Sequence, residues 1–385
     1  GFVPPRAPCR FSGLFRRFCL QHVSNPPGLP ALASSMLVSG TDSGAKEAEA
    51  VSATGLYDPG YEHDACGVGF VAALNGRADH ALVEKGIEAL VNLLHRGATG
   101  ADPETGDGAG LLLQIPDAFF RAVTPELGLE LPAPGAYGVG MFFLPQDPAL
   151  RGPVRGALEE AAAAEGLACL GWRDVPTEPG ALGAAARAAC PAVAQCFLAG
   201  GGRTGDALER KLWIVRKQAV RLAGLEPSGP SGFYPVSLSC RTMVYKGMMM
   251  APQVPRFYPE LRDSRLASAL VLFHQRYSTN TFPSWPLAQP FRFLAHNGEI
   301  NTLRGNRNWM AARERNLKSD LLGDDARKLA PILEPGASDS GQLDNALELL
   351  TLSGRTLEHA MFMLMPQAWG EIGRASCRER VYHPV

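Results

Sequence analysis

The sequence predicts an α+β fold in which sheet layers are covered by helices. Short apolar runs of strand length and longer segments with apolar residues at helical spacing follow one another along the chain. The two kinds of segment do not alternate strictly, which favours sheet layers over a doubly wound parallel sheet. The 385 residues, of which 46% are hydrophobic and 19% charged, are enough for a large core.

Residues 1–56 lack a folding pattern, and we expect the ordered chain to begin near Tyr57. Prolines interrupt any periodicity, and arginines occur with no acidic residue before Asp42. An acidic-poor segment that contains arginine resembles an organelle transit peptide, and the alternative is translated leader in front of a true start at Met36. Residues 39–54 are small and polar, as in disordered segments.

The first part of the ordered chain is predicted to contain seven strands and five helices. Asn75-Gly76 is typical of a hairpin turn, and Pro116 occupies the favoured first-turn position of a short helix. Glycine, proline and aspartate separate the elements. The strands are predicted at 67–74, 111–115, 137–144, 168–175 and 192–198 and as a pair at 233–239 and 242–246, and the helices at 80–94, from 116, and at 148–165, 181–188 and 206–222.

The second part is predicted to contain two buried strands and two helices. Met248–Met250 is expected to fill the core or a strand edge, as methionine often does. Ser340 is the expected N-cap of the last helix, because a serine hydroxyl can accept a hydrogen bond from a free amide of the first turn. The strands are predicted at 268–274 and 291–295, and the helices at 301–317, facing the surface, and at 342–350.

Charge and cysteine spacing argue against several functions. A formal net charge of −1 gives no reason to expect nucleic acid or an anionic membrane as a partner. No apolar run approaches the roughly 18 residues that span a bilayer. The eight cysteines include no CxxC pair, so no zinc site or redox dithiol is predicted, and a reducing compartment is favoured.

The last segment, residues 371–385, breaks the helical pattern that precedes it. It can be back-translated as a synthetic sequencing adapter, and we therefore expect a non-native tail here. We assign no function to Cys377, which lies in this segment.

Cys66 stands at the start of the first predicted strand. A cysteine in such a position is usually inert packing. Two distant segments change this expectation, namely the FHQRYSTN stretch at 273–280 and the LAHNGEI stretch at 294–300. Together they hold an arginine at the end of a buried strand and an Asn-Gly pair.

Four segments carry a resemblance to a known family: DACGVGF, HRGATGAD, HQRYSTNTFPSWPLAQPFRFLAHNGEINTLRGNRNWM and SDSGQLDNALELL. Residues 57–369 resemble the amidotransferase domain of the glutamate synthase large subunit, a class II, N-terminal-nucleophile glutamine amidotransferase. The resemblance implies a four-layer αββα fold with stacked antiparallel sheets. It divides the chain into a leader or propeptide at 1–65, the amidotransferase domain at 66–370 and the tail.

The resemblance implies that the chain is cut so that Cys66 becomes its first residue. The freed α-amine has an ordinary pKa of about 7.7–8.0 and can act as the base for the thiol, whose pKa is about 8.5. The thiolate would attack the amide carbon of L-glutamine, release ammonia and leave a thioester for water to hydrolyse. Asn297 and Gly298 would stabilise the oxyanion, although an Asn-Gly pair alone is more often a plain turn.

The resemblance also implies how glutamine is held. Arg276 would bind its α-carboxylate with a bidentate fork, the alternative being a surface ion pair. Asp339 would hold the α-ammonium group, although a helix cap is an alternative and Asp344 lies close by. Thr279 and its neighbours at 277–280 would line the pocket.

Four further residues near these motifs receive no direct catalytic role. Arg96 and Asp102, in the Gly-rich loop, would order the surroundings of the nucleophile or be structural. His274 and His296 precede the two key motifs, and each is expected to be a hydrogen-bonded core histidine and not a base.

In the family, ammonia passes through a tunnel to a synthase domain of the same full-length chain, which carries FMN and an iron–sulfur cluster and converts 2-oxoglutarate to glutamate. This sequence contains no cysteine cluster and no flavin motif, so no cofactor is expected in these residues. The expected partners are L-glutamine, the synthase domain and a small reductase subunit, with nicotinamide or ferredoxin left open as the electron donor. The expected location is the cytoplasm, or the plastid if residues 1–35 are a transit peptide.

Two alternatives remain at this point. Another class II enzyme, feeding purine or glucosamine synthesis, is disfavoured by the long insertion between Gly110 and Leu270 and by the FPSWPLAQPF run. A non-catalytic relative would be favoured if Cys66 were never exposed as an N-terminus.

Overall fold

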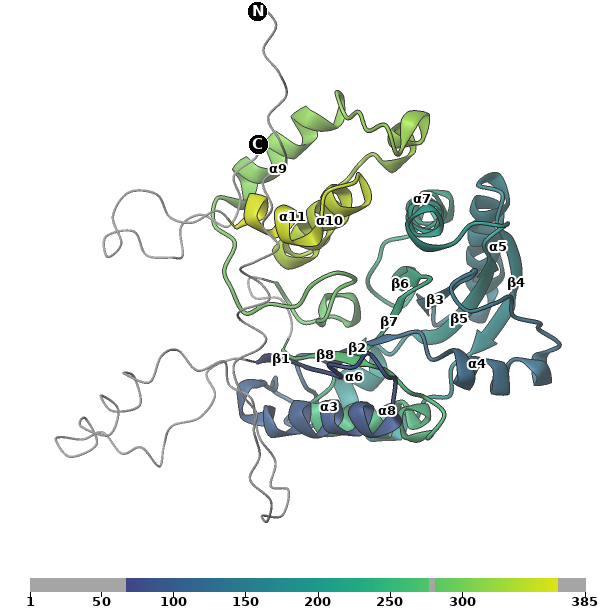
Figure 1. The fold of residues 1–385 in the computed structure, drawn as a ribbon. Coiled ribbons are helices and arrows are strands. Elements are labelled where there is room, and N and C mark those ends of the chain that lie inside the picture. The colour runs from purple at the N-terminus through teal and green to yellow at the C-terminus, as the bar shows by residue number, and fades with distance from the viewer. Residues whose placement is uncertain (1–66, 277–280, 366–385) are drawn as a thin grey trace, which may run out of the picture. The chain divides into compact units, whose positions relative to one another are not determined.

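The structure is a computed structural model that describes residues 67–276 and 281–365. Residues 1–66 lie outside this part, so the predicted start near Tyr57 and the leader at 1–65 have no structural counterpart here. Two four-stranded antiparallel sheets form the centre of the described chain, with the strand orders β1-β8-β2-β7 and β4-β5-β3-β6 (Figure 1). The strands are β1 Val68–Ala72, β2 Ala109–Gln114, β3 Tyr137–Leu144, β4 Ala168–Asp174, β5 Ala192–Ala199, β6 Tyr234–Ser239, β7 Thr242–Gly247 and β8 Leu270–Gln275.

Helices cover both outer faces of the two sheets. The α-helices are α3 His80–Asn92, α4 Asp117–Val123, α5 Pro148–Ala164, α6 Ala184–Ala188, α7 Gly205–Ala223, α8 Val254–Phe257, α9 Leu303–Glu314, α10 Asp339–Leu352 and α11 Leu357–Leu364. Short 3-10 helices are η2 Leu94–Arg96, η3 Pro125–Leu127, η4 Pro179–Ala181, η5 Ala251–Gln253, η6 Pro259–Arg262, η7 Trp285–Leu287 and η8 Gly323–Leu329.

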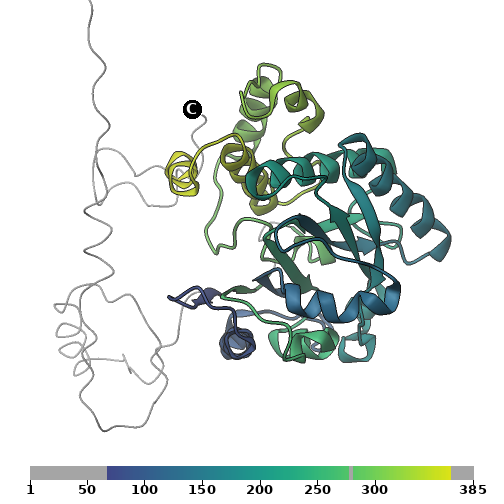
Figure 2. The ribbon, with the colours of Figure 1, turned by 45° about the vertical axis from the view of Figure 1, so that its right-hand side comes forward.

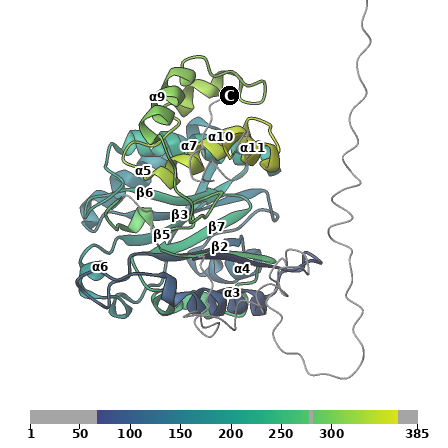
Figure 3. The same cartoon turned by 90° about the vertical axis from the view of Figure 1, so that its left-hand side faces the viewer.

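The four layers follow one another as helix, sheet, sheet and helix (Figure 3). Helix α3 contacts β1 and β8 of the first sheet, and α5 and α7 contact the second sheet. Every residue of β3 is buried, because the first sheet covers one of its faces and the helices cover the other. This explains why β3 reads as a continuous apolar run without alternation. The predicted αββα fold is confirmed.

Glycine permits the close approach of α3 to the first sheet. A Cβ atom on Gly86 would lie 2.4 Å from Cγ1 of Val271 on β8. Any larger side chain would push the helix away from the strand. The helical stripe predicted at 80–94 therefore lies against the strand that leads to Arg276.

Both strands predicted at 233–239 and 242–246 form, but the prediction that they pair with each other is wrong. Strand β6 joins β3 in the second sheet, whereas β7 joins β2 in the first sheet. The chain changes sheets at this short turn. Apolar patterning marks both strands but does not specify which neighbour each one bonds.

The turn predicted at Asn75-Gly76 forms, but the prediction that it joins the two strands of a hairpin is wrong. A turn is present, with Gly76 at φ 70° and its N–H donating to the Ala73 carbonyl at 2.9 Å. It leads into α3, however, and the partner of β1 is the distant strand β8.

The strand predicted at 291–295 does not form. The N–H groups of Phe293 and Leu294 donate to Oδ1 of Asp344 at 2.8 and 3.2 Å. A carboxylate from α10 thus replaces a strand partner. The N-cap of α10 is Ser338, whose Oγ accepts from Gly341 N–H at 3.0 Å, so the prediction of Ser340 is wrong by two residues.

Helices α9, α10 and α11 form a group beside α7 (Figures 1 and 2). Apolar side chains of α7 and α10 pack together, including Trp213, Ile214, Leu349 and Leu352. Within this contact, Arg216 of α7 bonds the carboxylate of Glu348 of α10, and both side chains are almost fully buried. Among the described residues, no helix is long and apolar enough to cross a membrane.

The buried pair predicts a large cost for removing one charge. Glu348→Gln keeps the side-chain volume but removes the bonded carboxylate and leaves buried Arg216 with only the more distant Glu334 carboxylate, at 3.9 Å, among the described residues. We expect a loss of about 3–5 kcal/mol in the free energy of unfolding, measured by urea denaturation.

The matched control is Asp206→Asn, which breaks the exposed pair between Arg241 and Asp206, whose side chains are 54% and 66% exposed. This change should cost less than about 1 kcal/mol. Equal losses in the two variants would show that α10 is not held by the buried pair.

Candidate active site

A cavity of about 180 Å³ lies at the end of β8. Its lining comes from segments that are distant in the sequence: the residue before β1, the 3-10 helix η2, the end of β8, the loop at 289–299 and the first turn of α10. The lining residues are Gly67, Arg96, His274, Gln275, Arg276, Gln289, His296, Asn297, Gly298, Glu299 and Ser340. A cavity of this size suits a small ligand such as an amino acid.

Strand pairing brings the start of β1 to this cavity. Val68 of β1 is paired with His274 of β8, and the N–H of Gln275 donates to the Gly67 carbonyl at 2.7 Å. Gly67 therefore lies directly beside Gln275, the last residue of β8, which immediately precedes Arg276. Cys66, which precedes Gly67 in the chain, lies outside the described residues, as does Thr279.

Arg276 lines the cavity with a side chain that is 46% exposed. Its φ of 151° is unusual for a residue other than glycine, and such backbone strain is concentrated at functional sites. Its Nε lies 3.7 Å from Oδ2 of Asp107, a buried carboxylate from the Gly-rich loop. Burial raises the pKa of Asp107, and the nearby Arg276 opposes this rise.

The Gly-rich loop thus contributes through a residue that the sequence analysis missed. Asp107 also accepts from Ala98 N–H at 3.2 Å, which closes the loop on itself. Asp102, predicted to order the surroundings of the nucleophile or to be structural, accepts from Thr105 Oγ1 at 2.6 Å and does not line the cavity. Its role in the structure is to hold the loop, whereas Arg96 does line the cavity. The only signal for Asp107 in the sequence is an acidic residue between two glycines.

Asn297 and Gly298 lie together in the cavity wall. The loop that carries them is held by Gln289, whose Nε2 donates to the His296 carbonyl at 3.2 Å and whose Oε1 accepts from His296 N–H at 3.0 Å. Gln289 is buried, and nothing in its sequence context indicated this role. The structure therefore brings three of the predicted site residues, Arg276, Asn297 and Gly298, into one cavity beside Gly67.

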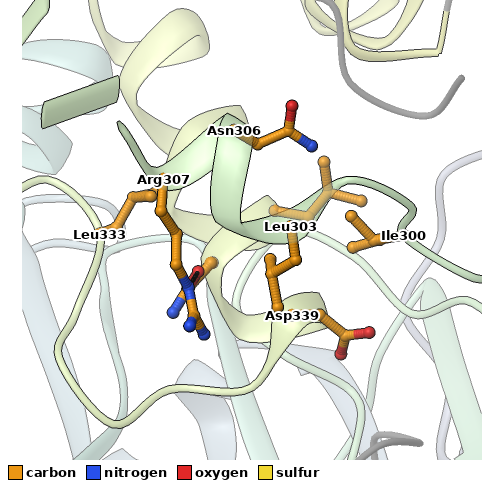
Figure 4. A pocket seen from close by; sticks show the side chains of 8 residues that line it. Ile300, Leu303, Asn306, Arg307, Leu333 and Asp339 are labelled. Atoms are coloured by element: carbon orange, nitrogen blue, oxygen red, sulfur yellow. Dashed lines mark hydrogen bonds between the residues drawn. The ribbon is translucent and has the colours of Figure 1, made fainter. Parts of the chain in front are cut away.

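Asp339 lies next to this cavity and not in its lining. It is buried in the first turn of α10, where its Oδ1 accepts from Ser340 N–H at 2.7 Å. It lines a neighbouring, much smaller cavity, where its carboxylate is turned away from Arg307 (Figure 4). The predicted alternative, Asp344, is fully buried and bonded to the backbone of the 291–295 segment, so it does not reach the cavity.

A comparison with protein families matches residues 66–383 to the class-II glutamine amidotransferases. The chain belongs to this family. The match begins at Cys66, the residue that precedes the cavity wall. Among the described residues, no group of three or more His, Cys, Asp or Glu side chains is placed to hold a metal ion.

The chain is similar to curated glutamate synthases. It is 46% identical over 333 residues to the large chain of the NADPH glutamate synthase of Bacillus subtilis, which covers 86% of this chain and 22% of the relative. It is 44% identical over 310 residues to the ferredoxin-dependent glutamate synthase 2 of Synechocystis, which covers 80% and 20%. The chain thus spans about a fifth of the length of these relatives.

His274 is the most buried titratable residue of the cavity wall, with 1% of its surface exposed. Its Nε2 lies 2.8 Å from Asn297 Oδ1, and its Nδ1 lies 3.1 Å from the Arg276 carbonyl oxygen. Burial lowers the pKa of His274 to about 4, while the hydrogen bonds oppose this shift. The prediction of a hydrogen-bonded core histidine is confirmed for His274.

The lowered pKa of His274 predicts a pH dependence of stability. The folded-state pKa of about 4 lies below the ordinary value of 6.5. Between these values the unfolded chain binds the proton more readily, so the free energy of unfolding falls as the pH falls. As the pH is lowered from 7 to 6 and 5, the wild type should therefore lose stability relative to His274→Gln. Urea unfolding of both proteins at the three pH values measures this difference. A difference that does not change with pH would contradict the assignment.

Proposed function

We propose that this chain is the glutamine-hydrolysing part of a glutamate synthase and converts L-glutamine to glutamate and ammonia through a thioester at Cys66. One observation carries the proposal. Gly67, the residue that follows Cys66, lines the same cavity as Arg276, Asn297 and Gly298. The family match that begins at Cys66 and the similarity to glutamate synthases support it.

The proposed reaction begins with removal of residues 1–65, which frees the α-amine of Cys66. This amine takes the thiol proton, and the thiolate attacks the amide carbon of glutamine. The oxyanion receives hydrogen bonds from the side-chain NH₂ of Asn297 and the backbone N–H of Gly298. The protonated amine then gives its proton to the departing nitrogen, ammonia leaves, and water hydrolyses the thioester to glutamate.

In this proposal Arg276 binds the α-carboxylate of glutamine, because its guanidinium is half exposed and its carboxylate neighbour in the described part of the chain, Asp107, lies 3.7 Å from Nε, which leaves donors for a ligand. Asp339, whose neighbour Ser340 lines the cavity, is proposed to bind the α-ammonium group, and Thr279 to complete the pocket. The amidotransferase domain would end at residue 370, before the tail at 371–385.

The remaining functions are proposed from the resemblance to glutamate synthases, of whose length this chain spans about a fifth. A synthase domain of the same full-length chain, with FMN and an iron–sulfur cluster, would receive the ammonia, and a small reductase subunit would assist. The relatives include NADPH, NADH and ferredoxin-dependent enzymes, so the reductant stays open. The cytoplasm is the proposed location, with the plastid as the alternative; one relative, from Arabidopsis thaliana, is named chloroplastic/mitochondrial.

The nucleophile is tested by Cys66→Ala. Purified wild type should begin at Cys66 by mass spectrometry and release ammonia from glutamine, whereas the alanine variant should release none, because no thiolate can attack the amide. Circular dichroism should show an unchanged fold.

The control is Cys190→Ala. Burial raises the pKa of the Cys190 thiol to about 12, so it is a poor nucleophile and the variant should stay active. Ammonia release by Cys66→Ala would remove Cys66 from the mechanism.

The carboxylate clamp is tested by Arg276→Lys. An ammonium group cannot bind a carboxylate with two parallel hydrogen bonds, so the KM for glutamine should rise by about tenfold or more, and kcat should change less. The matched control is Arg265→Lys, at an exposed surface pair with Asp263, which should leave both constants unchanged. An unchanged KM in Arg276→Lys would place Arg276 outside the substrate site.

A further inference from the structure

His274 lies at the junction of the two segments that form the cavity. It stands on β8 in register with Gly110 of β2, and a Cβ atom on Gly110 would lie only 2.8 Å from the Gln289 carbonyl oxygen. The loop at 289–299 therefore lies directly on this row of the sheet. The missing side chain at Gly110 allows the loop to come within hydrogen-bond distance of the imidazole.

Both ring nitrogens of His274 face oxygen atoms of the site. Nε2 lies 2.8 Å from Asn297 Oδ1 and 3.1 Å from the His296 carbonyl oxygen. Nδ1 lies 3.1 Å from the carbonyl oxygen of Arg276. A single buried side chain thus contacts the residues proposed to bind the oxyanion and the substrate carboxylate.

The proton on His274 decides which way the Asn297 amide faces. With hydrogen on Nε2, the imidazole donates to Asn297 Oδ1, and the amide presents its NH₂ group on the other side. Without that hydrogen, Nε2 accepts only, so Asn297 must turn its NH₂ toward the imidazole and its oxygen away. An oxygen facing a developing oxyanion would repel it.

We propose that His274 is a positioning residue that donates from Nε2 to Asn297 Oδ1 and so directs the Asn297 amide NH₂ toward the oxyanion. This inference rests on the proposed function and deepens it. His274 does not contact the reacting atoms in this proposal. Its contribution is to hold a donor in place before charge develops, which is the condition under which such donors are effective.

Two conservative substitutions separate the two ring nitrogens. The amide nitrogen of glutamine can occupy the place of Nε2, whereas that of asparagine can occupy the place of Nδ1. His274→Ala should lower kcat for glutamine hydrolysis by about 10²-fold with the KM changed by less than about threefold, since a lost oxyanion donor costs about 10²–10³. His274→Gln should recover most of kcat, and His274→Asn should not.

The reverse pattern, with recovery by asparagine and not by glutamine, would overturn the proposal, because His274 would then act through the Arg276 carbonyl. Equal activity of all three variants would also overturn it. If His274→Ala does not fold, as judged by circular dichroism, the glutamine and asparagine variants still decide, because both keep a polar side chain in the buried position.

A double-mutant cycle gives a second readout that a purely structural role would not produce. If His274 acts only by orienting Asn297, then His274→Ala should cause no further loss of kcat in the Asn297→Ala background. Additive losses would mean that His274 supports the fold in general. Failure of the proposed function is visible separately, because the full wild-type chain is tested first. If the wild-type chain releases no ammonia from glutamine, the proposed function is wrong, and the positioning role of His274 is wrong with it.

Discussion

The antiparallel pairing of β1 with β8 is the constraint on which the candidate site depends. It joins the first and the last strand of this sheet in sequence, so that Gly67 lies beside Gln275, the residue that precedes Arg276. A slip of one residue would turn His274 to the opposite face of the sheet, away from the loop at 289–299. The close contact of Gly86 with Val271 helps to hold β8 in this position, because α3 lies directly on it.

The loop at 289–299 is held by side chains and not by a strand ladder. Asp344 and Gln289 bond its backbone N–H groups, and Asp344 also lies 3.5 Å from Arg292. Buried charges are stable only when they are paired, so the loop, Arg292 and α10 have to form together. The proposed oxyanion donors therefore stand on a segment whose position is specified by buried interactions, as preorganised catalysis requires.

The Gly-rich loop supplies the third part of the site. Glycine-rich backbone lets Asp107 reach under Arg276, where the carboxylate is buried while the guanidinium stays half exposed. One partner is thus enclosed and the other faces the cavity. The buried carboxylate favours the charged guanidinium, and the exposed side of the guanidinium keeps donors for a ligand. The strained backbone of Arg276 is a further feature that is common at functional sites.

Much of the molecule could be predicted from the sequence alone. The apolar periods located the eight strands and the main helices to within a few residues, because burial on one or both faces leaves a local pattern. The cysteine, Arg276 and Asn297-Gly298 motifs also indicated the family before any geometry was known. The sequence did not reveal that β6 and β7 belong to different sheets, that 291–295 is a loop, or that Asp107, Gln289 and His274 support the site. These features depend on which distant groups satisfy each backbone amide and each buried charge, and only the tertiary structure decides that.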